Sequence, residues 1–392
     1  RRSFFNKLAT LFIGILVLSG NALAGPVEVA FAGFAYSGSD ASLDQRFPYS
    51  RRYESSLKTS DSPLHATLFR SLTASPSEHI RIVSQIAELK GRDQALSVAL
   101  VIGSETISVE KFGSIYKLMA LIRGQSMFFD FKSMNVVRSY PISFAYVDTL
   151  DHEPSTREIQ ERVKLVYEGA KDKPGLLARF SASVAGATIP NQVSRYVQVT
   201  SARIAPEAAQ LLPSYIKNDP SAAESWAADL VSEAISTRAG IPIVPFTKGY
   251  AIGNVMSYRV SDGTVWELKL PKPDYEISVE LSNLKKVKFA EVPGGGTSYI
   301  YASYSQIKLE EPMTRKAYMS TALKNGETRV IPASQDYGDD APNFYDSING
   351  MFVKLAQEIA GTGDGSWIKT AASAPDINKQ LIQTSELIKQ CK

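Results

Sequence analysis

Side chains that carry most enzyme chemistry are scarce in this chain of 392 residues, which contains three histidines and one cysteine. His65 and His79 stand at expected helix starts, and His152 lies between two acidic residues, so each is interpreted as a surface or capping residue. The chain lacks a G-x-S-x-G turn, a P-loop and a G-x-G-x-x-G motif. One cysteine excludes a disulfide framework and a multi-cysteine metal site. The sequence therefore predicts no catalytic residue and no cofactor.

Acidic residues gather in front of the last long helix pattern, at Asp336, Asp339, Asp340 and Asp346. Carboxylates at close spacing are the ligands that calcium prefers. Their spacing does not match an EF-hand loop, and acidic residues also favour helix N-termini without any metal. No metal site is predicted on this evidence, and Asp336, Asp339 and Asp340 are kept as weak calcium candidates.

Tyrosines are concentrated in one expected strand, where Tyr299 and Tyr301 share a face and Tyr304 lies on the other. Aromatic side chains fill protein cores and also dominate protein interfaces. The pattern leaves three interpretations open: core, protein interface and carbohydrate-stacking surface. We take Tyr299 and Tyr301 as interface candidates.

Two α+β units are expected to position these residues. The first has strand patterns at 27–36 and 96–103, with helical patterns at 64–72 and 78–90 between them, then a hairpin of 115–131 with 136–147. Ser155 and Glu158 form a capping box at the start of the helix that follows.

The second unit repeats that order of strand, helix, strand, hairpin and helix. Its strands are expected at 196–204, 241–246, 275–281 and 299–309. Its helices follow Asp219 and Asn343. The repetition predicts two similar sheet-plus-helix domains that arose by duplication. Two unrelated α+β domains are the alternative.

The expected domain boundaries follow from composition. A signal peptide is predicted over 1–24, a first domain over 25–170, a linker over 171–195 and a second domain over 196–360. Residues 361–392 are predicted to form a flexible linker and a C-terminal helix that docks on the body or on a partner. That helix presents Leu381 and Ile388 as interface candidates. Cys391 is expected either in a disordered end or in a link between subunits.

The first 24 residues have a basic start, an apolar run and an A-x-A cleavage site ending at Ala24. A buried N-terminal helix is the alternative, and export by the general secretory route is favoured over the twin-arginine route. The remaining chain has 40 basic and 40 acidic residues, so its charge predicts no nucleic-acid partner. We expect an exported protein of the periplasm, with outer-membrane association or a place at the cell surface left open.

A resemblance to known proteins supports this expected location in the cell. Residues 99–103, 118–131 and 135–140 together resemble the core of the curli-secretion lipoprotein family, and related periplasmic domains of flagellar outer rings and polysaccharide-export lipoproteins. The similarity is one of pattern and covers about residues 27–170. It implies an envelope component that assembles into rings or docks on the outer membrane without catalysis. The chain departs from the family because no cysteine for lipidation follows Ala24 and no alternating apolar stretch is long enough for a membrane hairpin.

Two classes of function follow from the sequence. The first is a non-enzymatic, oligomeric scaffold or assembly component of an envelope complex with protein partners. The second is an exported hydrolase or carbohydrate-binding protein with an unrecognised carboxylate site. A symmetric ring favours the scaffold, whereas a deep pocket with two facing carboxylates favours the enzyme.

Overall fold

The computed structural model describes residues 25–38, 40–58, 63–89, 91, 94–189, 195–247, 251–252, 255–260, 263–293, 296–333 and 339–392. Sheets and helices alternate along the chain, so the protein is α+β, as the sequence patterns predict. The expected signal peptide and the aspartate at 336 lie outside the described residues.

The first half of the chain holds these elements: β1 Val27–Ser37, α1 Asp40–Arg46, α2 Pro48–Lys58, α3 Leu64–Thr73, β2 Ile80–Val83, the 3-10 helix η1 Ile86–Leu89, β3 Leu96–Phe112, β4 Ile115–Asp130, β5 Asn135–Leu150, α4 Thr156–Glu168, β6 Gly169–Ala170, β7 Lys173–Pro174 and α5 Leu176–Ala185. The capping box at the start of α4 is confirmed, since the side chains of Ser155 and Glu158 each accept a hydrogen bond from the other's backbone N–H.

The second half holds these elements: β8 Val197–Ile204, α6 Pro206–Ala209, α7 Ser214–Lys217, α8 Pro220–Ala239, β9 Ala251–Ile252, β10 Val255–Val260, β11 Val265–Lys269, β12 Tyr275–Val292, β13 Gly296–Glu311, β14 Lys316–Ile331, α9 Ala341–Ala360, α10 Ser366–Ala371 and α11 Ile377–Lys389. None of the helices in the described part of the chain is both long and apolar enough to cross a membrane.

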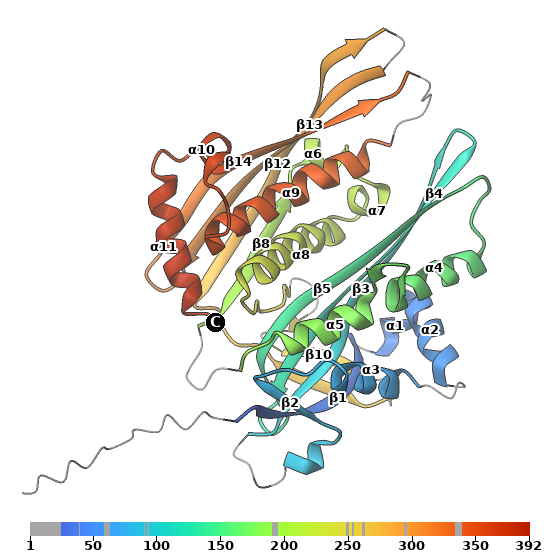
Figure 1. Cartoon of the computed structure of the whole chain (residues 1–392), viewed down its shortest axis with the longest axis vertical. Helices are drawn as coiled ribbons and strands as arrows, with labels where there is room; N and C mark the ends of the chain where they lie inside the picture. The colour runs from blue at the N-terminus through green and yellow to red at the C-terminus, as the bar shows by residue number, and fades with distance from the viewer. Residues whose placement is uncertain are drawn as a thin grey trace, which may run out of the picture.

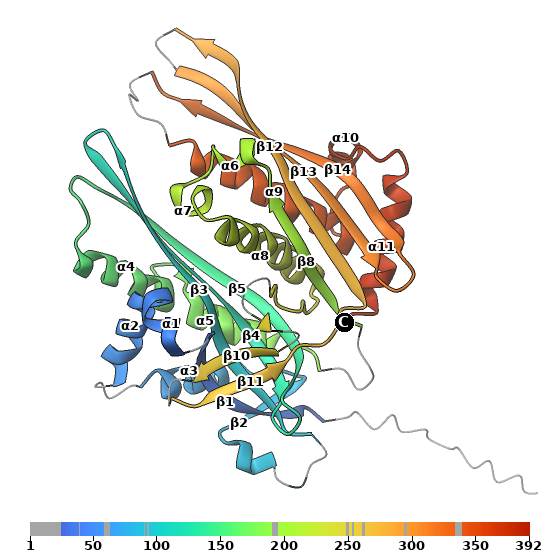
Figure 2. The same cartoon turned by 180° about the vertical axis from the view of Figure 1, so that it is seen from behind.

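Helices and sheets form alternating layers (Figures 1 and 2). Helices α1–α5 pack on one face of the first sheet. Helix α8 lies between β5 of the first sheet and β8 of the second. Helices α8, α9 and α11 pack on the same face of the second sheet. The opposite face of the second sheet is wet, as the alternation of residues 275–281 predicts.

The first sheet contains strands from both halves of the chain. Its order is β2-β1-β3-β4-β5-β11-β10-β9, and β10 also pairs with the end of β1, which closes a ring of strands. Strands β9, β10 and β11 therefore belong to the first sheet, although the sequence analysis places them inside a second domain over 196–360. The physical reason is an apolar inner face: Val101, Met127 and Phe129 pack against Tyr258 and Leu268 of this added segment.

The second sheet has the order β14-β13-β12-β8, with β8 parallel to β12 and the other pairs antiparallel. Strands β1, β3, β4 and β5 repeat this connectivity in the first sheet. The recurrence of order is a property of the fold, and a common origin by duplication stays a prediction.

Helix α8 is apolar on nearly every side because it lies between two sheets. Asp219 caps its start by accepting hydrogen bonds from the backbone N–H groups of Ser221, at 2.9 Å, and Ala222, at 3.1 Å. Gly240 ends it in the left-handed region, with φ at 63°. The neighbouring helix α9 buries the whole stripe that its sequence predicts: Phe344, Ile348, Phe352, Leu355 and Ile359.

The C-terminal helix α11 packs on the second core, so it docks on the body of the chain, which is one of the two alternatives that the sequence leaves open. Ile377, Leu381, Leu387 and Ile388 of α11 are buried with the residues of α8 and α9. Cys391 is buried as well, and burial raises its pKa to about 12, so it is neither a disordered end nor an accessible thiol.

Candidate functional site

The expected interface residues do not share one exposed surface. Tyr301 is fully buried, with its ring edge-on to Phe344 at 5.2 Å and its hydroxyl donating to Asp340 Oδ1 at 2.5 Å. Tyr299 is half-buried against the same core. Leu381 and Ile388 are buried too, so three of the four candidates are core residues of this chain and not exposed interface residues.

The acidic residues near α9 form separate ion pairs. Asp339 pairs with Lys117 of β4, Asp340 with Lys286 of β12 at 2.8 Å, and Asp346 with Arg329 of β14 at 2.7 Å. Among the described residues, no three groups of metal-ligating type come together. Asp339 and Asp340 are ion-pair partners in this structure, and the Lys117–Asp339 pair joins the first sheet to the start of α9.

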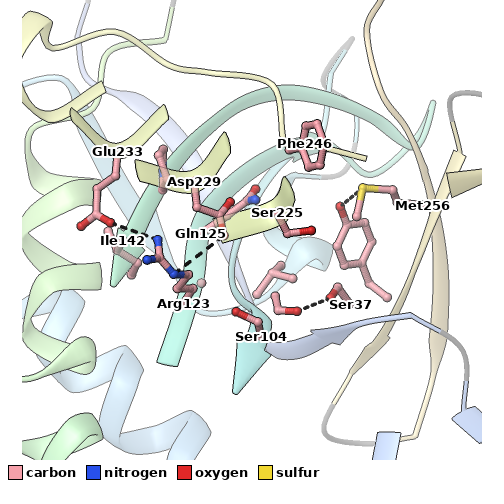
Figure 3. A pocket seen from close by; sticks show the side chains of 15 residues that line it. Ser37, Ser104, Arg123, Gln125, Ile142, Ser225, Asp229, Glu233, Phe246 and Met256 are labelled. Atoms are coloured by element: carbon pink, nitrogen blue, oxygen red, sulfur yellow. Dashed lines mark hydrogen bonds and ion pairs between the residues drawn. The ribbon is translucent and has the colours of Figure 1, made fainter. Parts of the chain in front are cut away.

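A charged cluster occupies the junction between the first sheet and α8 (Figure 3). Arg123 projects from β4, and Asp229 and Glu233 project toward it from successive turns of α8. Arg123 Nε lies 3.8 Å from Asp229 Oδ2, and Arg123 Nη1 lies 3.8 Å from Glu233 Oε2. Ser143 of β5 donates its hydroxyl to Glu233 Oε2 at 2.6 Å. Strands β4 and β5 and helix α8 thus each contribute side chains to one cluster.

Burial dominates the electrostatics of this cluster. It raises the pKa of Asp229 to about 6; the charge of Arg123 opposes that rise and the carboxylate of Glu233 adds to it. Burial also works against the charge of Arg123, but the attraction of Asp229 and Glu233 outweighs it, so the pKa of Arg123 rises. The cluster holds one more carboxylate than cations, and Asp229 is the carboxylate that takes up a proton below about pH 6.

Two cavities border the cluster: one of about 250 Å³, whose wall includes Arg123 and Asp229, and a smaller one that also includes Glu233. The volume of the smaller one is about 80 Å³, and its wall includes Gln125 of β4 and Ser225 of α8 (Figure 3). This space accommodates a few water molecules, whereas ligand pockets usually measure about 300–1,000 Å³. Both carboxylates also face Arg123, so they lack the free geometry that paired acid–base groups need at a substrate. The arrangement is suited to holding the first sheet and α8 together.

The raised pKa of Asp229 predicts a pH effect on stability. Its pKa rises from 3.8 to about 6 on folding, so the folded protein keeps a proton that the unfolded chain has lost between these values. The stabilisation that protonated Asp229 contributes is therefore fully present below a pH of about 3.8 and is lost as the pH rises through about 6. In urea titrations, the free energy of unfolding of the wild type is expected to fall between about pH 4.5 and about pH 7. That of Asp229→Asn is expected to fall less over the same interval. The same pH dependence in both proteins would contradict the raised pKa.

Sequence reasoning missed Arg123, Asp229 and Glu233 because isolated charges usually lie on solvated faces. One signal was present: two acidic residues, four positions apart, interrupt a helix whose other sides are apolar. When two carboxylates of this kind are buried, the element that packs against the helix must supply a cation for them.

The outer edge of β14 is a second candidate, for binding a protein. Near Leu323 the edge is covered by the chain itself, since Ala372 forms a bridge with Leu323 and the hydroxyl of Ser373 accepts from the backbone N–H of Ala322 at 3.0 Å. Beyond Asn325, no strand in the described part of the chain pairs with this edge. The backbone N–H and C=O groups on the outer edge of β14, from residue 325 to 331, are therefore available to pair with a strand of another chain.

Exposed apolar side chains accompany the uncovered edge. The ends of β12, β13 and β14 project beyond α9 in Figure 1. Phe289 of β12 is 70% exposed and Val330 of β14 is 66% exposed, with Val287 exposed beside them. Val330 is in register with Ser298, which in turn is in register with Ala290, next to Phe289. We call Val287, Phe289, Val330 and the β14 edge from 325 to 331 the edge patch.

Comparisons with known proteins give little further information. No family model matches the chain, and no curated protein matches it. A crystal structure of a Xanthomonas campestris protein described under the family model DUF330 aligns with 11% identity over 43% of this chain and 84% of that chain, with a TM-score of 0.20. A putative neuraminyllactose-binding hemagglutinin homolog from Helicobacter pylori aligns with 9% identity over 47% of this chain and 95% of that chain, with a TM-score of 0.22. At these scores neither similarity decides a function for this chain.

Proposed function

We propose that this protein is a non-enzymatic scaffold of the bacterial cell envelope that assembles with a second copy of itself through the edge patch. The observation that carries the proposal is the uncovered half of the β14 edge, flanked by exposed Phe289 and Val330. The pattern of residues 1–24 supports export, and the resemblance of residues 99–140 to periplasmic ring components supports an envelope role.

The edge patch combines two features that natural proteins usually avoid together. Edge strands are normally shortened, charged or covered, because free backbone groups recruit other strands. Here the cover from residues 372–374 ends near Leu323, and the strand continues to Ile331 with an exposed valine. Antiparallel pairing of two β14 strands joins two second sheets into one and places Val330 at the contact, with Phe289 on β12 two strands further in. Such a contact is self-complementary and closes as a two-fold dimer.

The proposal predicts that a charged edge patch prevents assembly. Wild-type protein is expected to have the mass of a dimer by light scattering, and the variant Phe289→Ser/Val330→Lys is expected to have the mass of a monomer. Lysine on an edge strand blocks pairing because its charge would be buried in the contact. Met313→Lys is the matched control, since Met313 is exposed in the turn at the opposite end of the same hairpin. A monomeric wild type, or a dimer in all three proteins, would overturn the proposal.

A second candidate function is an exported hydrolase or carbohydrate-binding protein. The observation in its favour is the pKa of Asp229, raised to about 6 beside Glu233 in a cavity, because perturbed carboxylates cluster at active sites. Arg123 faces both carboxylates, so neither is free to act on a substrate and the scaffold is the better supported of the two. Hydrolysis of model glycosides that disappears in Asp229→Asn would reverse this order.

A further inference from the structure

The two cavities beside Arg123 share part of their walls. Both are lined by Gly103 and Ser104 of β3, Arg123 of β4, and Ser225 and Asp229 of α8. The larger cavity measures about 250 Å³ and the smaller one about 80 Å³, so together they approach the volume of a small-ligand pocket. The edge patch involves none of these residues.

The charged groups of the cluster keep much of their hydrogen-bonding capacity. The contacts of the Arg123 guanidinium with Asp229 and Glu233 both measure 3.8 Å, which is longer than a hydrogen bond (Figure 3). Within the part of the chain that the structure describes, the side chains of Arg123 and Asp229 make ion pairs but no hydrogen bond. The side chains of Asp229 and Glu233 are 32% and 24% exposed, and both line the smaller cavity, so a molecule inside it can reach their oxygen atoms.

We propose that these cavities bind a small, uncharged molecule with adjacent hydroxyl groups, such as a cyclic polyol. A gap of 3.8 Å between a donor and an acceptor accommodates one hydroxyl oxygen, which accepts from the guanidinium and donates to the carboxylate. Two such gaps start from the same planar group, at Nε and Nη1 of Arg123, so neighbouring hydroxyls of one molecule can fill both. The proposal concerns a ligand that is held without hydrolysis, and it goes beyond the assembly proposed above.

The preference for an uncharged ligand comes from the charges that surround the gaps. A cation in either gap lies against the guanidinium, and an anion lies against Asp229 or Glu233, so each meets a like charge at short range. Arg46 and Glu105 add one charge of each sign to the wall of the larger cavity. Arg46 already donates to two backbone carbonyls, so it does not offer a free cation to an anionic ligand.

The larger cavity provides access and an apolar wall. Gln45 of α1, which is exposed, lies at its edge, and Leu121, Tyr215 and Trp226 form its apolar side. Aromatic and aliphatic side chains pack well against the carbon skeleton of a ring. We therefore expect the carbon ring in the larger cavity and the hydroxyl groups at Arg123.

Three probes with a six-membered ring separate these requirements. Inositol is an uncharged polyol, glucuronate carries a carboxylate, and cyclohexanol has a single hydroxyl. Saturation-transfer NMR and calorimetry on the whole protein at about pH 7 are expected to show binding of inositol, with the other two at least about tenfold weaker. Absence of inositol binding at millimolar concentration would leave only water in the gaps and overturn the proposal. Binding of glucuronate or cyclohexanol as tight as that of inositol would overturn it as well.

Substitution of the guanidinium tests the gaps. Arg123→Lys keeps the positive charge but replaces the planar group by a single ammonium, so the two side-by-side gaps are lost and inositol is expected to bind about tenfold more weakly. Arg162→Lys is the matched control, because Arg162 contacts Asp148 directly, at 2.6 Å, outside the cavities. Equal binding in wild type and Arg123→Lys would exclude Arg123 from the site.

Two neighbouring positions on α8 test the location without touching the charges. Ala222 lines the larger cavity, whereas Ser221 is exposed and lines neither cavity. Ala222→Leu narrows the cavity and is expected to abolish inositol binding, and Ser221→Leu is expected to leave it unchanged. Urea titration checks that both variants are folded. Unchanged binding in folded Ala222→Leu would show that inositol binds elsewhere.

Discussion

A chain that ends at Gly361 is expected to lose the fold of its second sheet and the helices packed on it. The deleted residues include five buried apolar side chains: Ile368, Ile377, Leu381, Leu387 and Ile388. Each buried side chain of this kind contributes about 1.5–3 kcal/mol, so five contribute about 8–15 kcal/mol. The whole stability of a typical domain is about 5–15 kcal/mol. Near-UV circular dichroism and a urea titration are expected to show an unfolded or aggregated second half.

Single substitutions in α11 provide the controls for this truncation. Leu387→Ala removes a buried side chain and is expected to cost about 2–5 kcal/mol. Ile382→Ala, on the exposed side of the same helix, is expected to change stability by less than about 0.5 kcal/mol. Wild-type denaturation midpoints for the truncated chain would contradict the packing of α11 on the second core.

Arg123→Met is expected to destabilise the protein by about 1–3 kcal/mol, because it leaves two partly buried carboxylates without a cation. Urea titration at neutral pH gives the measurement. The triple variant Arg123→Met/Asp229→Asn/Glu233→Gln removes the uncompensated charge and is expected to recover most of the loss, since uncharged groups can replace a buried ion cluster at little cost.

A surface pair is the matched control for this experiment. Arg157 and Glu161 form an ion pair on the exposed face of α4, and Arg157→Met is expected to cost less than about 1 kcal/mol. If Arg123→Met costs no more than Arg157→Met, the cluster does not hold the first sheet to α8.

Local patterns in the sequence were sufficient for most individual elements. The capping box of Ser155 and Glu158 predicts the start of α4, and Asp219 and Gly240 delimit α8. The linker at 132–135 predicts the hairpin of β4 and β5. Each of these features depends on residues a few positions apart, so the chain itself contains all the information that they need.

Non-local contacts account for what the sequence did not predict. Nothing in residues 251–269 shows that they pair with β1 and β5 rather than with their own neighbours. The tyrosines of this strand fit a core, an interface or a carbohydrate-stacking surface equally well, and Tyr301 lies on a buried face of β13 that continues with the polar residues Ser303 and Ser305. The hydroxyl groups of Ser303 and Ser347 of α9 lie 2.9 Å apart, so the polar residues of this face are satisfied inside the core.

The pairing of β10 with β1 has a consequence for the order in which the chain can fold. Ser37 of β1 is in register with Tyr258 of β10, so one side of the ring cannot form until the chain beyond residue 258 is available. A ribosome or export channel that releases the N-terminus first delivers β1, β3, β4 and β5 with Met127 and Phe129 still uncovered. Contacts between residues far apart in the sequence slow folding. Chaperones bind apolar surface that stays exposed until such contacts form. The two halves are therefore interleaved, and no cut between β8 and β9 divides the chain into fragments that each contain a complete sheet and its cover.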